Sequence, residues 1–264
     1  WIDRSGNGNI ATVYGSPYDL LFKQGYNDSA STSTGRDNQG FPLKQKDVGA
    51  MGIHLRGVPG AGSATDPGNT TATGVPVRSI VTSGNAYSGN AFTVSAWVNP
   101  TSLGTGYTRV IVNKRTQNGH WPSISLSVGS TGTLIAQYSS TTYGQCLETY
   151  TTATGLIEQD KWYHVVFVKP AGTPSINYLE VKLYINGVNT AWTNSLYGNH
   201  LYSNTVATST QPLYIGRALD GDNLTGTWVS TFVGQIGPIH LYSRGLTAEE
   251  VTQNYNAQRS RFNV

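Results

Sequence analysis

The sequence predicts an all-β fold of the sandwich type that ends in one short helix. Apolar and polar side chains alternate along many short segments, as in Phe92–Val98, and this period of two is typical of strands with one buried face. Hydrophobic residues make up 38% of the chain and charged residues only 12%. The remainder is rich in Gly, Ser, Thr and Asn, which favours strands joined by turns over helices.

The length favours a single domain over residues 1–264, because sandwiches often reach about 250 residues as one unit. Two stretches, 24–47 and 57–76, are dense in turn-forming residues and predict long loops, which are often functional. The chain begins at Trp1 without a Met, so we expect it to be a piece of a longer protein.

Turn signals divide the rest of the chain into short strands. The expected strands are Ile10–Tyr14, Ala50–Leu55, Val77–Thr82, Phe92–Val98, Arg109–Asn113, Ser123–Val128, Thr133–Tyr138, Trp162–Lys169, Leu179–Ile185, Pro212–Gly216 and Phe232–Tyr242. The pair Asn186-Gly187, which precedes Val188, predicts a tight hairpin with a type I′ turn, since both residues tolerate positive φ.

A helix is predicted at about 248–258. Thr247 can cap its first turn while Glu250 reaches back to the cap amide, which is the capping-box pattern. Leu246, just before the cap, is placed to pack on Val251 and fix the direction in which the chain enters the helix.

Six segments carry sequence motifs of one known family, in the same order as in that family. They are Trp1–Asn9, Phe92–Val98, Trp162–Val166, Leu183–Val188, Leu213–Gly216 and Phe232–Glu250. Together they resemble the laminin G-like family of concanavalin A-like jelly rolls. The resemblance covers about residues 1–15 and 90–258, and the opening segment is most similar to modules of phage structural proteins and bacterial surface proteins.

The resemblance implies a non-catalytic module of a larger surface assembly, such as a virion decoration, a tail or fibre component, or a bacterial surface protein. Its expected partners are glycans or a cell surface, together with other subunits of the assembly, and its expected location is a virion surface or the cell exterior. Two alternatives stay open: a purely structural capsid-decorating protein without a ligand, and a polysaccharide hydrolase or lyase.

Bulk properties exclude several other classes. A net charge of +3, with Lys114-Arg115 as the one adjacent basic pair, is too small and too scattered for nucleic acid. No apolar run reaches the roughly 20 residues of a membrane-spanning helix. The single cysteine, Cys146, allows no intrachain disulfide. Subunit contacts, including those of a homo-oligomer, would therefore come from loops and sheet faces.

Catalytic residues are not indicated. Retaining glycosidases hold two carboxyl groups about 5 Å apart, which on a strand requires acids at alternating positions. No such pattern occurs among the five glutamates, which are Glu148, Glu158, Glu180, Glu249 and Glu250.

Two further candidates for acid–base chemistry are histidines. Lyase chemistry needs an Arg, a His or Gln, and a Tyr on neighbouring strands. Gln235 and His240 are close in sequence, but their spacing puts them on opposite faces of a regular strand unless a bulge forms at Gly237-Pro238. His164 is expected to be half exposed, with a structural hydrogen bond rather than a catalytic role.

Loop residues form the candidate glycan site. Sugar rings stack on aromatic side chains, and their hydroxyls need planar polar partners. Such residues gather in two segments: Trp192, Asn194, Tyr197, His200 and Tyr202, then Asp220, Asp222, Asn223 and Trp228. Tyr143 and Tyr150 are expected in a third loop. The alternative is that Trp192 and Trp228 cover the core instead of binding sugar.

The same loop offers a candidate calcium site. Asp220, Asp222 and Asn223 supply three oxygen ligands within four residues, and calcium prefers oxygen. The alternative is a polar turn in which these side chains bond their own backbone. The histidines show no metal-binding spacing.

Overall fold

The computed structural model describes the chain in segments: residues 11–14, 20–24, 51–55, 79–82, 91–104, 108–115, 122–139, 147–171, 181–197, 206, 213–219 and 229–264. For the segments before Ala91 only the backbone is described. The expected long loops at 24–47 and 57–76 lie outside the described residues, apart from Gln24. The prediction of one domain over the whole chain stays a prediction.

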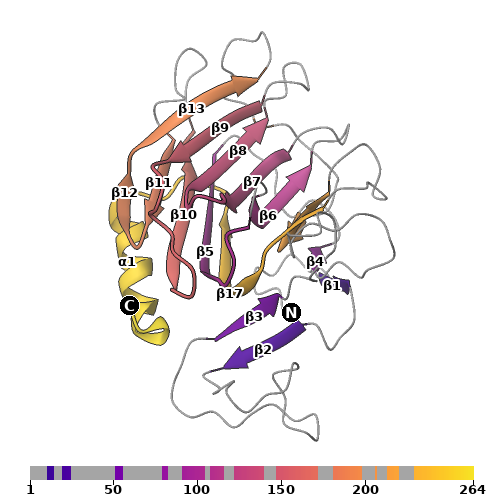
Figure 1. The fold of residues 1–264 in the computed structure, drawn as a ribbon. Helices are drawn as coiled ribbons and strands as arrows, with labels where there is room; N and C mark the ends of the chain where they lie inside the picture. The colour runs from indigo at the N-terminus through magenta and orange to yellow at the C-terminus, as the bar shows by residue number, and fades with distance from the viewer. Residues whose placement is uncertain are drawn as a thin grey trace, which may run out of the picture.

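Two antiparallel sheets form the body of the protein (Figure 1). The first sheet has eight strands in the order β1 (Ala11–Tyr14), β4 (Ser79–Thr82), β14 (Leu213–Ile215), β6 (Arg109–Arg115), β7 (Pro122–Val128), β8 (Leu134–Ser139), β9 (Leu147–Thr152) and β13 (Trp192–Tyr197). The second has seven, in the order β12 (Val188–Thr190), β11 (Lys182–Ile185), β10 (Tyr163–Lys169), β5 (Phe92–Pro100), β17 (Gly234–Tyr242), β3 (Met51–Leu55) and β2 (Leu20–Gln24). A separate pair joins β15 (Arg217–Leu219) to β16 (Val229–Thr231).

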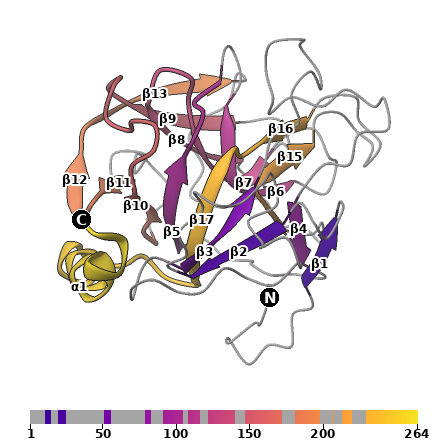
Figure 2. The same ribbon diagram turned by 60° about the horizontal axis from the view of Figure 1, so that its bottom comes forward.

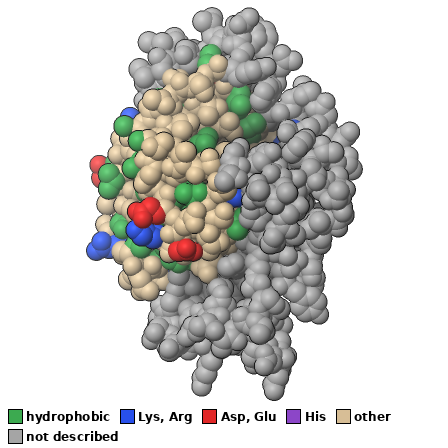
Figure 3. Space-filling view, in the orientation of Figure 1, with side chains coloured by type: hydrophobic (Ala, Val, Ile, Leu, Met, Phe, Trp, Pro, Cys, Tyr) green, Lys and Arg blue, Asp and Glu red, His purple; other side chains and the backbone are tan. Residues whose placement is uncertain are grey.

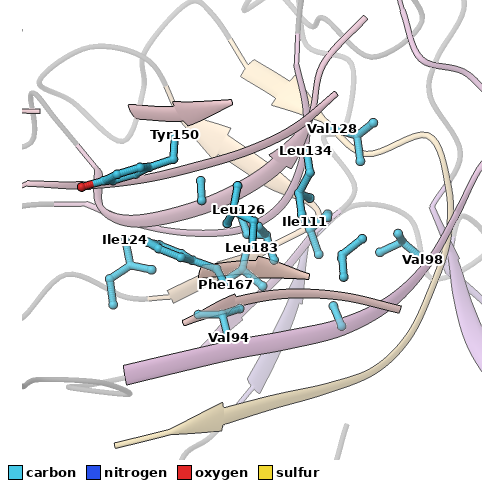
Figure 4. Close-up of a cluster of buried hydrophobic side chains, with 14 of the residues drawn as sticks. Val94, Val98, Ile111, Ile124, Leu126, Val128, Leu134, Tyr150, Phe167 and Leu183 are labelled. Carbon is cyan, nitrogen blue, oxygen red and sulfur yellow. The ribbon is translucent and has the colours of Figure 1, made fainter. Parts of the chain in front are cut away.

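The core lies between the two sheets (Figure 4). Val94, Phe167 and Leu183 of the second sheet face Ile111 and Leu126 of the first, and all five side chains are buried. Their burial follows from the period-two pattern, which puts every second side chain on the inner face. The predicted all-β jelly-roll sandwich with a short C-terminal helix is confirmed.

All of the expected strands overlap an observed strand, and six observed strands were not predicted: β2, β9, β12, β13, β15 and β16. Of these, β9 and β13 matter most here. They are neighbours at one edge of the first sheet. Tyr150, expected in a loop, lies in β9 and is 0% exposed, so that expectation was wrong.

The predicted hairpin and helix are both present. Asn186 and Gly187 have φ of 54° and 78°, as a type I′ turn requires, and they join β11 to β12. Helix α1 (Ala248–Gln258) starts at the cap Thr247 with both hydrogen bonds of the capping box, and a 3-10 turn, Arg259–Phe262, follows it.

The helix packs against the outer side of the second sheet, alongside β10 and β11 (Figure 2). Leu246 and Val251 lie in one buried cluster with Val166, Val168 and Tyr184 of these two strands. The contact predicted between the residue before the cap and the first turn of the helix is therefore confirmed.

Candidate functional site

A row of uncharged polar side chains crosses the outer face of the first sheet. Residues such as Leu126 and Ala136 point into the core, so their neighbours in the chain point outward. The strand register aligns these outward residues into a row that crosses five strands: Asn113, Ser125, Gln137, Thr149 and Ser195. We call this set the polar row. Each of its side chains carries a hydroxyl or an amide, and none carries a charge.

Exposure of the polar row rises toward the edge of the sheet. Ser125 is 3% exposed, Gln137 and Thr149 are half-buried, and Ser195 on the edge strand β13 is exposed. Gln137 Nε2 donates to Thr149 Oγ1 at 3.0 Å, which fixes the amide across two strands. Asn113 Oδ1 is buried and has no hydrogen-bond partner among the described residues. An unpaired buried carbonyl oxygen is unusual, and it can accept a hydrogen bond from a ligand or a water.

The described surface is sparsely charged on the side shown in Figure 3, where most atoms belong to uncharged polar side chains or backbone and hydrophobic side chains are scattered singly. Two of the described carboxylates form ion pairs away from the polar row. Glu158 pairs with Lys161 at 2.7 Å, and Glu250 pairs with Arg244 at 2.6 Å.

Trp192 lies at the edge of the core. Its Nε1 donates to the backbone oxygen of Val181 at 3.1 Å, and its ring meets Tyr150 edge-on with ring centres 4.8 Å apart. The side chain is half-buried and packs against the hydrophobic core. These contacts match the alternative in which Trp192 covers the core.

The other predicted glycan-site residues are only partly visible. Asn194 is half-buried in β13, and Tyr197, described by its backbone alone, ends that strand. The rest lie outside the described residues: His200, Tyr202, Asp220, Asp222, Asn223 and Trp228. The glycan prediction for this set, and the calcium prediction for Asp220, Asp222 and Asn223, stay predictions. Within the described ranges no cluster of His, Cys, Asp and Glu side chains could hold a metal ion.

His164 is buried, not half exposed as expected, since it is only 1% exposed. Helix α1 and the turn after it bring aromatic rings over the outer side of β10, and the His164 ring lies 6.0 Å from that of Tyr255 and 5.1 Å from that of Trp97. Its Nε2 shares a 2.8 Å hydrogen bond with Ser95 Oγ, so the predicted structural bond is confirmed. Burial, with a smaller effect of His240, lowers the pKa of His164 to about 4. The ring is therefore neutral at pH 7.

A bulge changes the faces of Gln235 and His240. The pairing of β17 with β5 shifts between Ile236 and Ile239, so the two residues lie opposite Asn99 and Ser95. These partners are four apart on one strand and share a face, so the expectation of opposite faces was wrong and the bulge considered at Gly237-Pro238 is present. Four residues of strand still span about 13 Å, too far for the pair to act on one proton.

A buried acid in β9 was missed by the sequence reasoning. Glu148 is 0% exposed, and its Oε2 accepts hydrogen bonds from the hydroxyls of Tyr138, at 2.6 Å, and Tyr150. Burial raises the pKa of Glu148, while the two hydroxyls and the charge of Lys169 act in the opposite direction. In β9 the polar residues Glu148 and Tyr150 face the core, whereas inward positions of a strand are usually apolar. The sequence therefore held no ordinary apolar alternation that would have marked this strand.

Comparison with known protein families assigns the chain to one of them. A laminin G-type family model, described as the concanavalin A-like lectin/glucanases superfamily, matches residues 70–252. Among curated proteins no relative matches the chain. No described helix is long and apolar enough to cross a membrane.

Solved structures share the fold at low sequence identity. Domain 4 of AbnA, an extracellular arabinanase of Geobacillus stearothermophilus solved with arabinotriose, has 19% identity and a TM-score of 0.52, with 95% of this chain and 90% of that chain covered. The binding domain of Paraclostridial Mosquitocidal Protein 1 has 16% identity and a TM-score of 0.53, with 97% and 49% covered. The binding domain of botulinum neurotoxin serotype G has 15% identity and a TM-score of 0.54, with 98% and 49% covered. The chain thus spans about half the length of both toxin domains. Since the family model covers well over half of the sequence, the chain belongs to the laminin G-like family of the concanavalin A-like lectin/glucanases superfamily.

Proposed function

We propose that the chain is a non-catalytic binding module that recognises carbohydrate on the outer face of the first sheet. The polar row carries this proposal. Sugar hydroxyls both donate and accept hydrogen bonds, and so do the amides and hydroxyls of Asn113, Gln137 and Thr149. An uncharged face of this kind suits a neutral glycan better than nucleic acid or an acidic peptide.

Two further points support this proposal. The superfamily includes lectins, and the similar domain of the arabinanase was solved in complex with arabinotriose. Ser195 also lies on the exposed edge strand β13, so one end of the polar row is open to a large ligand.

The residues predicted from the sequence extend this site. Strand β13 ends at Tyr197, and His200 and Tyr202 come three and five residues later in the sequence. Aromatic rings there would supply the stacking surface that the described row lacks. Bound calcium at Asp220, Asp222 and Asn223 would order a second loop; a calcium-dependent rise in thermal stability that disappears in Asp222→Asn is the test of that part.

A glycan array followed by calorimetric titration tests the function, with arabinotriose as the first soluble probe. In Gln137→Ala the ligand loses one hydrogen bond, and we expect a loss of affinity of about tenfold. Gln253→Ala, on the exposed face of α1, is the matched control and should bind as the wild type does. Equal affinity in both variants, or no binding of any glycan at millimolar concentration, would overturn the proposal.

Catalysis is tested on the same ligands. Any release of shorter oligosaccharides by the purified protein would replace the binding role with that of a hydrolase or lyase. A protein that is ligand-free on the array but firmly attached to capsids would instead fit the structural alternative.

We also propose that the module acts at a surface, on a virion or outside the cell, where it contacts other subunits of its assembly. This part rests on the resemblance of the opening segment to phage and bacterial surface modules. Immunogold labelling of particles and cells tests it, and label confined to the cell interior would contradict it.

A further inference from the structure

Lys114 is a buried charged residue that neither the fold nor the polar row explains. It lies in β6, is 0% exposed, and its Nζ has no hydrogen-bond partner among the residues that the structure describes. Burial alone lowers its pKa to about 8, so the side chain still carries a proton at pH 7. A buried charge without a partner is costly, and proteins normally pair it.

The neighbours of Lys114 in the sheet cannot pair it. Its register partners are Ile124 on β7 and Leu213 on β14, both 2% exposed and without polar side-chain atoms. The first acid along the same cross-strand row is Glu148, three strands away on β9. Three strand spacings amount to about 14 Å between the two backbones.

Glu148 is also already hydrogen-bonded to other side chains. Its Oε2 accepts from the hydroxyls of Tyr138 and Tyr150, and Lys169 is the cation that favours its charged form. Along this row of the described strands, no acid other than Glu148 faces the core, so no described carboxylate is placed to pair with Lys114.

The position of Lys114 suits a ligand site. Arg115, 6% exposed, is the last residue of β6, so the two cations stand within one residue of the strand end. The pairing of β6 with β7 shifts between them, and such bulges are over-represented beside functional sites. This is the one adjacent basic pair of the whole sequence.

We propose that Lys114 anchors a binding site for a small oxyanion, a carboxylate or a phosphate, at the end of the first sheet where β6 stops. An oxyanion supplies the hydrogen-bond acceptors and the negative counter-charge that the Lys114 ammonium lacks, and the two groups form a charge-assisted hydrogen bond. The site is separate from the polar row, because Lys114 points toward the core and the row points away from it. It can therefore exist whether or not the outer face binds sugar.

Thermal unfolding in different salts tests the site. At pH 7 and constant ionic strength, phosphate or acetate at ten times its dissociation constant should raise the Tm of the wild type by about 3 °C over chloride. Lys114→Met should lose this response, and Lys161→Met, which removes an exposed lysine, should keep it. Glucuronate compared with glucose separates a sugar-borne carboxylate from free phosphate as the source of the oxyanion. An equal response in Lys114→Met and the wild type, or no response at all, overturns the site.

An NMR titration of Lys114 in the wild-type protein tests the same site without any substitution, so the test does not depend on whether a variant folds. Side-chain nitrogen NMR should give Lys114 a pKa of about 8 without oxyanion and a value closer to 10.5 when phosphate saturates the protein. A pKa near 10.5 in the absence of any added anion would mean that the chain itself supplies the counter-charge. That result, or a pKa that phosphate does not change, refutes the proposal.

Discussion

Acid should destabilise this protein through His164. The ring is buried beside Trp97 and bonded to Ser95, and its pKa in the folded protein is about 4. An exposed histidine in the unfolded chain titrates near 6.5. Between these two values the unfolded chain binds a proton that the folded protein refuses, so the free energy of unfolding falls as the pH is lowered from about 6.5 to about 4.

The size of the effect follows from the shift. One pKa unit corresponds to about 1.4 kcal/mol, so a difference of about 2.5 units amounts to about 3 kcal/mol between pH 7 and pH 4. Two other buried groups also contribute to the pH dependence of stability. Burial lowers the pKa of His240, which adds to the loss in acid, and raises that of Glu148, which opposes it. A comparison of variants is therefore needed to isolate His164.

Guanidinium unfolding, followed by tryptophan fluorescence from pH 4 to pH 7.5, measures how the free energy of unfolding depends on pH. In the wild type we expect stability to fall steadily below pH 6.5. His164→Gln removes the titrating ring, so it should be less stable at pH 7 but should show a much flatter pH dependence. His240→Gln is the control and should retain most of the wild-type slope. A wild-type slope in His164→Gln, or a ring that titrates above pH 6 by NMR, would refute the reasoning.

The remaining predictions concern two glycine turns and the cap of helix α1. Gly132 and Gly155 have φ of 73° and 75°, but a Cβ on Gly132 would lie 2.3 Å from the backbone oxygen of Ile157, whereas one on Gly155 meets nothing within 4 Å. Gly155→Ala should therefore lower the free energy of unfolding by about 1 kcal/mol, because alanine disfavours this backbone conformation. Gly132→Ala should lower it clearly more, because its Cβ also meets the backbone. Equal losses in the two variants, measured by urea unfolding, would contradict this prediction. Thr247→Ala removes the cap of α1 and should cost about 1 kcal/mol, while Gln253→Ala on the same helix should change stability by much less.

The features predicted well from the sequence are those that depend on nearby residues. The alternation of Phe92–Val98 is set by which residues are apolar, and all four inward side chains are buried as expected. The turn at Asn186-Gly187 needs only two residues that accept positive φ, and the cap of α1 needs only Thr247 and Glu250. Each signal is complete within a few residues, so it can be recognised without knowledge of the tertiary contacts.

Two of the failures, at His164 and in β9, depend on partners that lie on other helices or strands. His164 was expected to be half exposed from its place between Tyr163 and Val165 on a strand. Tyr255, about ninety residues later, lies beside the ring of His164, and Phe262 stacks on the neighbouring ring of Trp97. Strand β9 was missed because Glu148 looks like a surface residue, and its burial depends on the hydroxyl of Tyr138 on the neighbouring strand.

The polar row shows the same dependence at the level of function. In the sequence, Asn113, Gln137 and Ser195 are ordinary outward residues of separate strands, and such residues usually only meet water. Strand pairing makes them neighbours, and that pairing is set by inward residues such as Leu126 and Ala136, since a slip of one residue would expose the core. The same hydrophobic alternation that specifies the sandwich therefore also aligns its candidate binding groups. A substitution on the inner face that shifted the register of β8 would disperse the row while leaving every polar residue in place.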